Sequence, residues 1–166
     1  GGASSSAEQA YADALRDAAQ CHGWRLRLGI LLGDDRQKPS VPELMAASEA
    51  VVLTSLQEGF GLPYLEAAAL RRPLVARQLP NIAPDLAKFG FKFPQSYREI
   101  MVDPILFDWA AERKRQQQMF RAWTGQMPRA AACLAGQPAV LAAGVTPRPV
   151  AFSRLPLQAQ LEVLAQ

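Results

Sequence analysis

The stretch Glu58-Gly-Phe-Gly-Leu-Pro-Tyr-Leu-Glu66 joins a strand-like run of residues to a helix-like one. Before it, Ala50–Ser55 is short, apolar and β-branched, as is typical of a buried strand. After it, Leu65–Leu70 consists of strong helix formers. Pro63 stands where a first helical turn would begin, a position that suits its fixed φ and its missing N–H. The stretch therefore predicts a strand, a tight loop and a helix.

A loop of this kind is suited to an anionic ligand that also carries hydroxyl groups. The helix start offers free backbone N–H groups and the positive end of the helix dipole. Gly59 and Gly61 let a ligand approach the backbone. Glu58 and Glu66 could face that ligand, and carboxylates beside an anion site are reasonable when they bind neutral hydroxyls, such as those of a sugar or ribose. The pattern thus indicates a nucleotide-sugar site.

Simpler interpretations of the same residues remain open. A Gly-x-Gly pair is often only a turn, Glu66 could only complement the helix dipole, and Glu58 could only be a solvated loop charge. The dinucleotide-binding fingerprint is excluded, because it needs a third glycine where Tyr64 stands.

The pattern on either side of this stretch alternates between strands and helices. We expect helices over residues 7–21, 43–48, 63–70 and 85–89, and strands over residues 24–32, 50–54 and 73–76. Ser6 is the expected cap of the first helix, and Gly23 its end. This order predicts an α/β fold with a doubly wound, Rossmann-like parallel sheet, in which ligands bind beyond the carboxyl ends of the strands.

Beyond Gly90 the pattern becomes helical. We expect helices over residues 95–101, 104–123 and 152–164, with a loosely ordered Ala-rich segment over 130–144 and a linker over 147–149. The sequence therefore predicts two domains. Residues 1–94 form a partial Rossmann-like nucleotide-sugar-binding domain, and residues 95–166 form a helical extension that packs on it.

The segment from Ser55 to Glu66, continued by Ala67–Ala76, resembles the donor-binding segment of the retaining family-four (group 1) glycosyltransferases of the GT-B fold. Their signature is a Glu, seven residues and a second Glu between a strand and a helix, and it is intact here as Glu58 and Glu66. The spacing, glycines, proline and following apolar strand all agree. The resemblance is good over residues 41–86 and looser on either side.

The resemblance implies roles for six residues. Glu58, the candidate catalytic residue, would contact hydroxyls of the donor sugar, and Glu66 would contact the ribose hydroxyls. The backbone of the four residues between Glu58 and Pro63 would approach the sugar and phosphates; these are Gly59, Phe60, Gly61 and Leu62. Apart from the resemblance, we expect Gly33–Asp35 to lie near the base. No metal and no cofactor is required, since the nucleotide diphosphate sugar is a substrate.

The same resemblance implies a parent enzyme of the hexosyltransferase type that moves a sugar from a nucleotide diphosphate sugar to an acceptor. A complete GT-B enzyme has two Rossmann-like domains, whereas 166 residues suffice for one. We therefore expect an incomplete C-terminal half of that fold, inactive without the N-terminal acceptor domain. The alternatives are a catalytically silent nucleotide-binding or interaction fragment, a nucleotide-sugar epimerase of the same fold, and a glycoside hydrolase with Glu58 and Glu66 as its acid/base pair.

The composition limits the kinds of partner and metal that the chain can bind. The chain has an apolar fraction of 49%, a net charge of +3 and a single histidine, His22, so a multi-His zinc site is excluded. There is no basic–aromatic platform for nucleic acid. The basic residues near Arg113–Arg115 suit a solvated helix face, or more weakly a peripheral contact with anionic lipid. Two distant cysteines suit a reduced, cytoplasmic protein, and an exposed sheet edge would favour homo-oligomers.

Overall fold

The computed structural model describes residues 5–31, 38–93 and 95–166. They divide into two compact units. The first contains Leu26–Arg98 with the residues before Ala10, and the second contains Ala10–Arg25 and Glu99–Gln166. The predicted domain boundary between residues 94 and 95, and the predicted packing of the second domain on the first, stay predictions.

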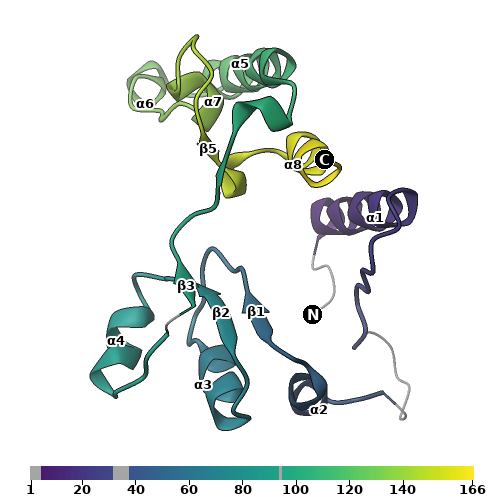
Figure 1. Cartoon of the computed structure of the whole chain (residues 1–166). Helices are drawn as coiled ribbons and strands as arrows, with labels where there is room; N and C mark the ends of the chain where they lie inside the picture. The colour runs from purple at the N-terminus through teal and green to yellow at the C-terminus, as the bar shows by residue number, and fades with distance from the viewer. Residues whose placement is uncertain (1–4, 32–37, 94) are drawn as a thin grey trace. The chain divides into compact units, whose positions relative to one another are not determined.

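The first unit is built on a three-stranded parallel sheet of order β1-β2-β3 (Figure 1). The strands are β1 (Val51–Leu53), β2 (Leu74–Arg77) and β3 (Ser96–Tyr97), and the helices are α2 (Val41–Ala47), α3 (Leu62–Ala69) and α4 (Ala83–Lys88). In the register, Val52 lies opposite Val75 and Ala76 opposite Ser96. The mixed α/β fold with a parallel sheet is thus confirmed, and it agrees with the expected partial Rossmann-like domain.

The core of this unit lies between the sheet and α3 and α4. Leu74 and Ala76 point into it from alternate positions of β2, where they meet Tyr64 and Ala67 of α3 and Leu86 of α4. The opposite side of the sheet is more open, because Val52 is 62% exposed. This one-sided core fixes the two helices whose N-terminal loops follow β1 and β2.

The strand expected over residues 24–32 is wrong for its described part, residues 24–31, where no strand forms. Gly29 has a φ of 69°, which breaks an extended backbone. Leu26, Ile30 and Leu31 are each about 40% exposed. An apolar run becomes a strand only when a neighbouring strand takes up its backbone hydrogen bonds, and here the described sheet ends at β1.

The helix expected over residues 95–101 is also wrong. The carbonyl of Gln95 accepts from Ala76 N (3.2 Å) and that of Tyr97 from Gln78 N (2.7 Å), so the segment pairs with β2 as β3. Residues Met101–Val102 then form β4 in the second unit. Pairing with a free strand edge has overridden a modest helical preference.

The second unit contains α1 (Ser6–Cys21) from Ala10 onward, together with β4 (Met101–Val102), η1 (Pro104–Leu106), α5 (Trp109–Gly125), α6 (Arg129–Ala132), α7 (Ala139–Ala142), β5 (Val150–Ala151), η2 (Phe152–Arg154) and α8 (Leu157–Leu164). Strands β4 and β5 pair antiparallel.

Three helices of this unit differ from the prediction at their ends. The cap of α1 is Ser5 rather than Ser6, since the Ser5 hydroxyl accepts from Glu8 N at 3.2 Å. Asp108 caps α5, so the expected helix over 104–123 is divided into η1 and α5. Pro156 stands before α8, and the expected helix over 152–164 is divided there, since proline cannot continue a helix.

Candidate functional site

The loop from Thr54 to Gly61 leaves the carboxyl end of β1 and leads into α3, as predicted. A second loop, residues 78–82, leaves the neighbouring end of β2 and leads into α4. The amide of Asn81 joins the two loops by donating from Nδ2 to the carbonyl oxygen of Glu58 at 2.9 Å. The carboxyl ends of two adjacent parallel strands are therefore linked at the position where such sheets bind ligands.

The two glycines of the first loop have different roles. Gly61 is the N-cap of α3 with a φ of 75°, and a Cβ there would stand 2.8 Å from Ile82 Cγ2. Its lack of a side chain is therefore required by the fold. For Gly59, a Cβ would meet no described atom within 4 Å. The backbone at Gly59 is thus open to a ligand, although packing alone would accept a side chain there.

The carboxylates of Glu58 and Glu66 are both half-buried, one in the loop and the other in the second turn of α3. Neither carboxylate forms a hydrogen bond or an ion pair with the part of the chain that the structure describes. They therefore remain available as acceptors for a ligand's hydroxyl groups. The charge of Glu58 is felt by Tyr64, whose phenol pKa is raised mainly by burial and further by that charge.

Tyr64 fixes the start of α3 against the sheet. It is 2% exposed, and its hydroxyl donates to the carbonyl oxygen of Arg77 at 2.7 Å, beyond the last apolar position of β2. Its ring meets the Phe93 ring edge-on, with centroids 5.1 Å apart. Tyr64 stands where the dinucleotide fingerprint has its third glycine, which lets the helix pack closely on the strand. Here the tyrosine ring packs between α3 and the sheet instead.

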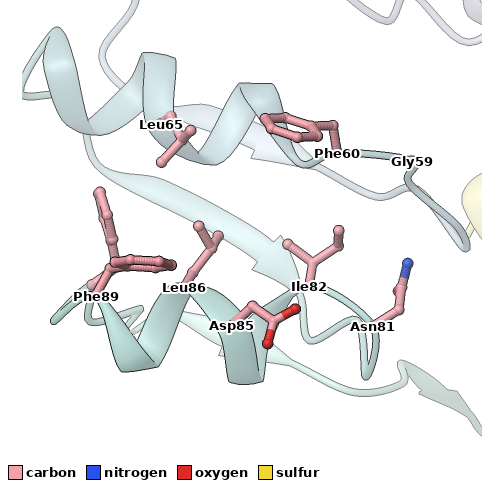
Figure 2. A pocket seen from close by; sticks show the side chains of 9 residues that line it. Gly59, Phe60, Leu65, Asn81, Ile82, Asp85, Leu86 and Phe89 are labelled. Atoms are coloured by element: carbon pink, nitrogen blue, oxygen red, sulfur yellow. The ribbon is translucent and has the colours of Figure 1, made fainter.

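Next to the loop lies a groove of about 510 Å³ between α3 and α4 (Figure 2). Phe60 and Leu65 line one side, and Ile82, Leu86 and Phe89 line the other. Asn81 and Asp85 supply its polar side chains; Asn81 lies on the side of Gly59, and Asp85 lies on α4 between Ile82 and Leu86 (Figure 2). Of the six predicted site residues, Gly59 and Phe60 line this groove; Glu58, Gly61, Leu62 and Glu66 do not.

The groove is not predicted from the sequence. Asn81 lies between the strand expected over residues 73–76 and the helix expected over residues 85–89, where no site residue is expected. Its contact with Glu58 joins residues 23 apart in sequence, and no local pattern reveals it. Asp85 was expected only as a helix start, and its carboxylate pairs with Lys88 at 2.9 Å. The predicted base-contacting segment, Gly33–Asp35, lies outside the described residues.

Within residues 5–31, 38–93 and 95–166, no group of three or more His, Cys, Asp or Glu side chains is arranged to hold a metal ion. No described helix has both the length and the apolar character needed to cross a bilayer. Cys21 and Cys133 are free and exposed.

Part of the chain matches a known protein family. Residues 3–105 match the family model described as "Glycosyl transferases group 1". That range contains the whole parallel sheet, both linked loops and the groove. No curated protein and no solved structure gives a significant match. Since the matched residues make up more than half of the chain, this protein belongs to the group 1 glycosyltransferases.

Proposed function

We propose that the loop and helix from Glu58 to Glu66 bind the donor, a nucleotide diphosphate sugar. The observation that carries this proposal is the pair of unengaged carboxylates, Glu58 and Glu66, on a loop whose Gly59 backbone is open, in a group 1 glycosyltransferase domain. Carboxylates without protein partners suit the many hydroxyl donors of a sugar and a ribose.

Each site residue then has a distinct role. Glu58, the proposed catalytic residue, accepts hydrogen bonds from hydroxyls of the donor sugar, and Glu66 accepts them from the ribose. The backbone of Gly59–Leu62 lies against the sugar and the diphosphate. The N-terminal end of α3, with Leu62 exposed, adds the favourable end of the helix dipole, a contribution of about 0.3–2 kcal/mol.

The proposed reaction moves a hexose to an acceptor hydroxyl with retention of configuration. The bond between the anomeric carbon and the diphosphate oxygen breaks, and a bond from the same carbon to the acceptor oxygen forms on the same face. The proton of the acceptor hydroxyl passes to the leaving diphosphate. This chemistry depends more on stabilising the diphosphate than on a protein base, and it requires an acceptor-binding part beside the donor site.

Calorimetric titration with UDP, GDP and ADP tests the proposal. One of these nucleotides should bind to the chain, and Glu66→Ala should weaken its binding. Hydrogen bonds to a charged group contribute roughly 1.5–3 kcal/mol, which corresponds to a loss of about ten- to a hundredfold in affinity.

Glu49→Ala is the matched control, because Glu49 is exposed and lies in the same unit before β1. The affinity of Glu49→Ala for the nucleotide should equal that of the unmodified chain. If Glu66→Ala also bound the nucleotide as tightly as the unmodified chain, the role of Glu66 would be refuted. Slow hydrolysis of a simple glycoside in the absence of any nucleotide would favour the glycoside hydrolase instead.

A further inference from the structure

Two arginine side chains of the second unit converge at the end of α7. Arg113 of α5 donates from Nε to the carbonyl oxygen of Gly144 at 3.3 Å, and Arg148 donates from Nε to the carbonyl oxygen of Ala143 at 2.7 Å. These two carbonyl groups are adjacent in the chain and directly follow the last residue of α7. Because α5 packs against α7, the two side chains are brought to one place from distant parts of the sequence (Figure 1).

Gly144 lies beside both guanidinium groups. Its carbonyl group holds Arg113, and a Cβ at Gly144 would stand 3.8 Å from Nη2 of Arg148. Its φ of 88° is in the left-handed region that favours glycine, so the turn after α7 depends on this residue. The turn therefore places two positive charges close together.

Neither guanidinium group has a negative partner. Among the residues that the structure describes, Arg113 and Arg148 form no ion pair, and each donates only from Nε. The sequence has no Asp or Glu between Glu112 and Glu162, and Glu112 pairs with Arg115. The two charges thus repel each other without a carboxylate to balance them.

Capping of α7 accounts for only a small part of what these side chains offer. A guanidinium group has five N–H donors in a planar fork, and each cap uses the one on Nε. The donors on the terminal nitrogens of both side chains stay available. Such forks suit phosphate, which accepts several hydrogen bonds at once. A phosphate monoester carries roughly −1.5 to −2 charges at neutral pH, which balances two guanidinium groups.

We propose that Arg113 and Arg148 bind the phosphate group of a phosphate monoester. The terminal nitrogens of both side chains donate to the phosphate oxygens, while the carbonyl groups of Ala143 and Gly144 keep the two forks in place through Nε. The inference does not rest on the proposed donor site, because the donor loop belongs to the first unit and both arginines belong to the second.

The test is an amide NMR titration of the whole labelled chain with glycerol 3-phosphate. The amide signals of Gly144, Val145 and Arg148 should move, and Arg148→Gln should weaken the response about ten- to a hundredfold, as expected for hydrogen bonds to a charged group. Arg148 is exposed, so the replacement leaves the core intact. Acetate should bind at least about tenfold more weakly than glycerol 3-phosphate, because it carries one charge and fewer acceptor atoms.

Arg154→Gln is the matched control, because Arg154 is exposed, lies in the same unit and removes the same charge. Its affinity for glycerol 3-phosphate should equal that of the unmodified chain. Sedimentation with phosphatidylcholine vesicles that contain phosphatidic acid identifies the source of the phosphate: binding that depends on Arg148 assigns it to a lipid headgroup, and binding of glycerol 3-phosphate alone assigns it to a soluble ester.

Three results would overturn the proposal. The first is a folded chain that responds to neither glycerol 3-phosphate nor the vesicles. The second is equal weakening in Arg148→Gln and Arg154→Gln, which would indicate general charge attraction. The third is acetate binding as tight as that of glycerol 3-phosphate.

Discussion

Gly61→Ala should unfold the first unit at a lower denaturant concentration than the unmodified chain. Gly61 has a φ of 75°, and a residue with a Cβ pays roughly 1–2 kcal/mol in that left-handed region. The new methyl carbon would also stand 2.8 Å from Ile82 Cγ2 and 3.5 Å from Tyr64 Cδ2. Ile82 is 7% exposed and β-branched, so it has little room to move, and overpacking of this kind costs about 1–3 kcal/mol.

The sum is a loss of roughly 2–5 kcal/mol in the free energy of unfolding. Urea denaturation followed by far-UV circular dichroism measures it as a fall in the midpoint. Gly59→Ala is the matched control, because a Cβ there meets no described atom within 4 Å; its stability should change by less than about 0.5 kcal/mol. Equal stability of the two variants would refute the structural role assigned to Gly61.

Two further substitutions test buried polar groups, Tyr64→Phe in the first unit and Glu112→Gln in the second. Tyr64→Phe removes the hydroxyl that donates to Arg77 O at 2.7 Å, and should destabilise the first unit by about 0.5–1.5 kcal/mol in urea denaturation; an unchanged midpoint would mean that this bond does not anchor α3. Glu112 of α5 is 1% exposed, pairs with Arg115, and accepts from Gln116 Nε2 at 2.7 Å. Burial raises the pKa of Glu112, while the bond from Gln116 and the charge of Arg115 lower it in part. The protonated form is therefore favoured on folding, so its contribution to stability is complete below the pKa of the unfolded chain and is lost as the pH rises through the folded-state pKa. In the unmodified chain, the urea midpoint should therefore fall as the pH rises across the acidic range, and Glu112→Gln should remove this fall. The same pH dependence of the midpoint in the variant and in the unmodified chain would contradict the role given to Glu112.

The elements that the sequence predicted correctly are those whose signals are local. The β-branched run before Glu58 and the Ala-rich run after it specify β1 and α3 within a few residues, and Pro63 marks the first turn. Pro42 and the capping box of Ser40 with Glu43 act in the same way for α2. Such signals depend on neighbouring residues, so the parallel α/β fold follows from them directly.

The errors occur where the outcome depends on a partner distant in sequence. The apolar run from Trp24 to Leu31 has the composition of a strand, but no described strand pairs with it. Gln95–Met101 has a plausible helical pattern, but the free edge of β2 recruits its first part as β3. Strand formation requires a second set of backbone groups, and a single segment carries no information about where they lie.

The site was foreseen in part for the same reason. Glu58, Gly59 and Glu66 belong to one continuous motif, and their roles remain predictions for binding experiments. The groove combines Phe60 and Leu65 with residues of α4 some twenty positions later. Asn81 joins the two loops, but the residues around it indicate only a turn. The sequence thus predicted the loop between β1 and α3 but not the groove beside it.

The most direct test of the central claim is an amide NMR titration of the isotopically labelled chain with UDP-, GDP- and ADP-glucose. We predict that one of them shifts the amide signals of Glu58–Leu62 and Glu66 more than those of any other segment, and that Glu66→Ala weakens the response at least about tenfold. A folded chain whose signals from residues 58–66 do not move with any of the three, or move equally in Glu66→Ala, would contradict the assignment of this loop as the donor site.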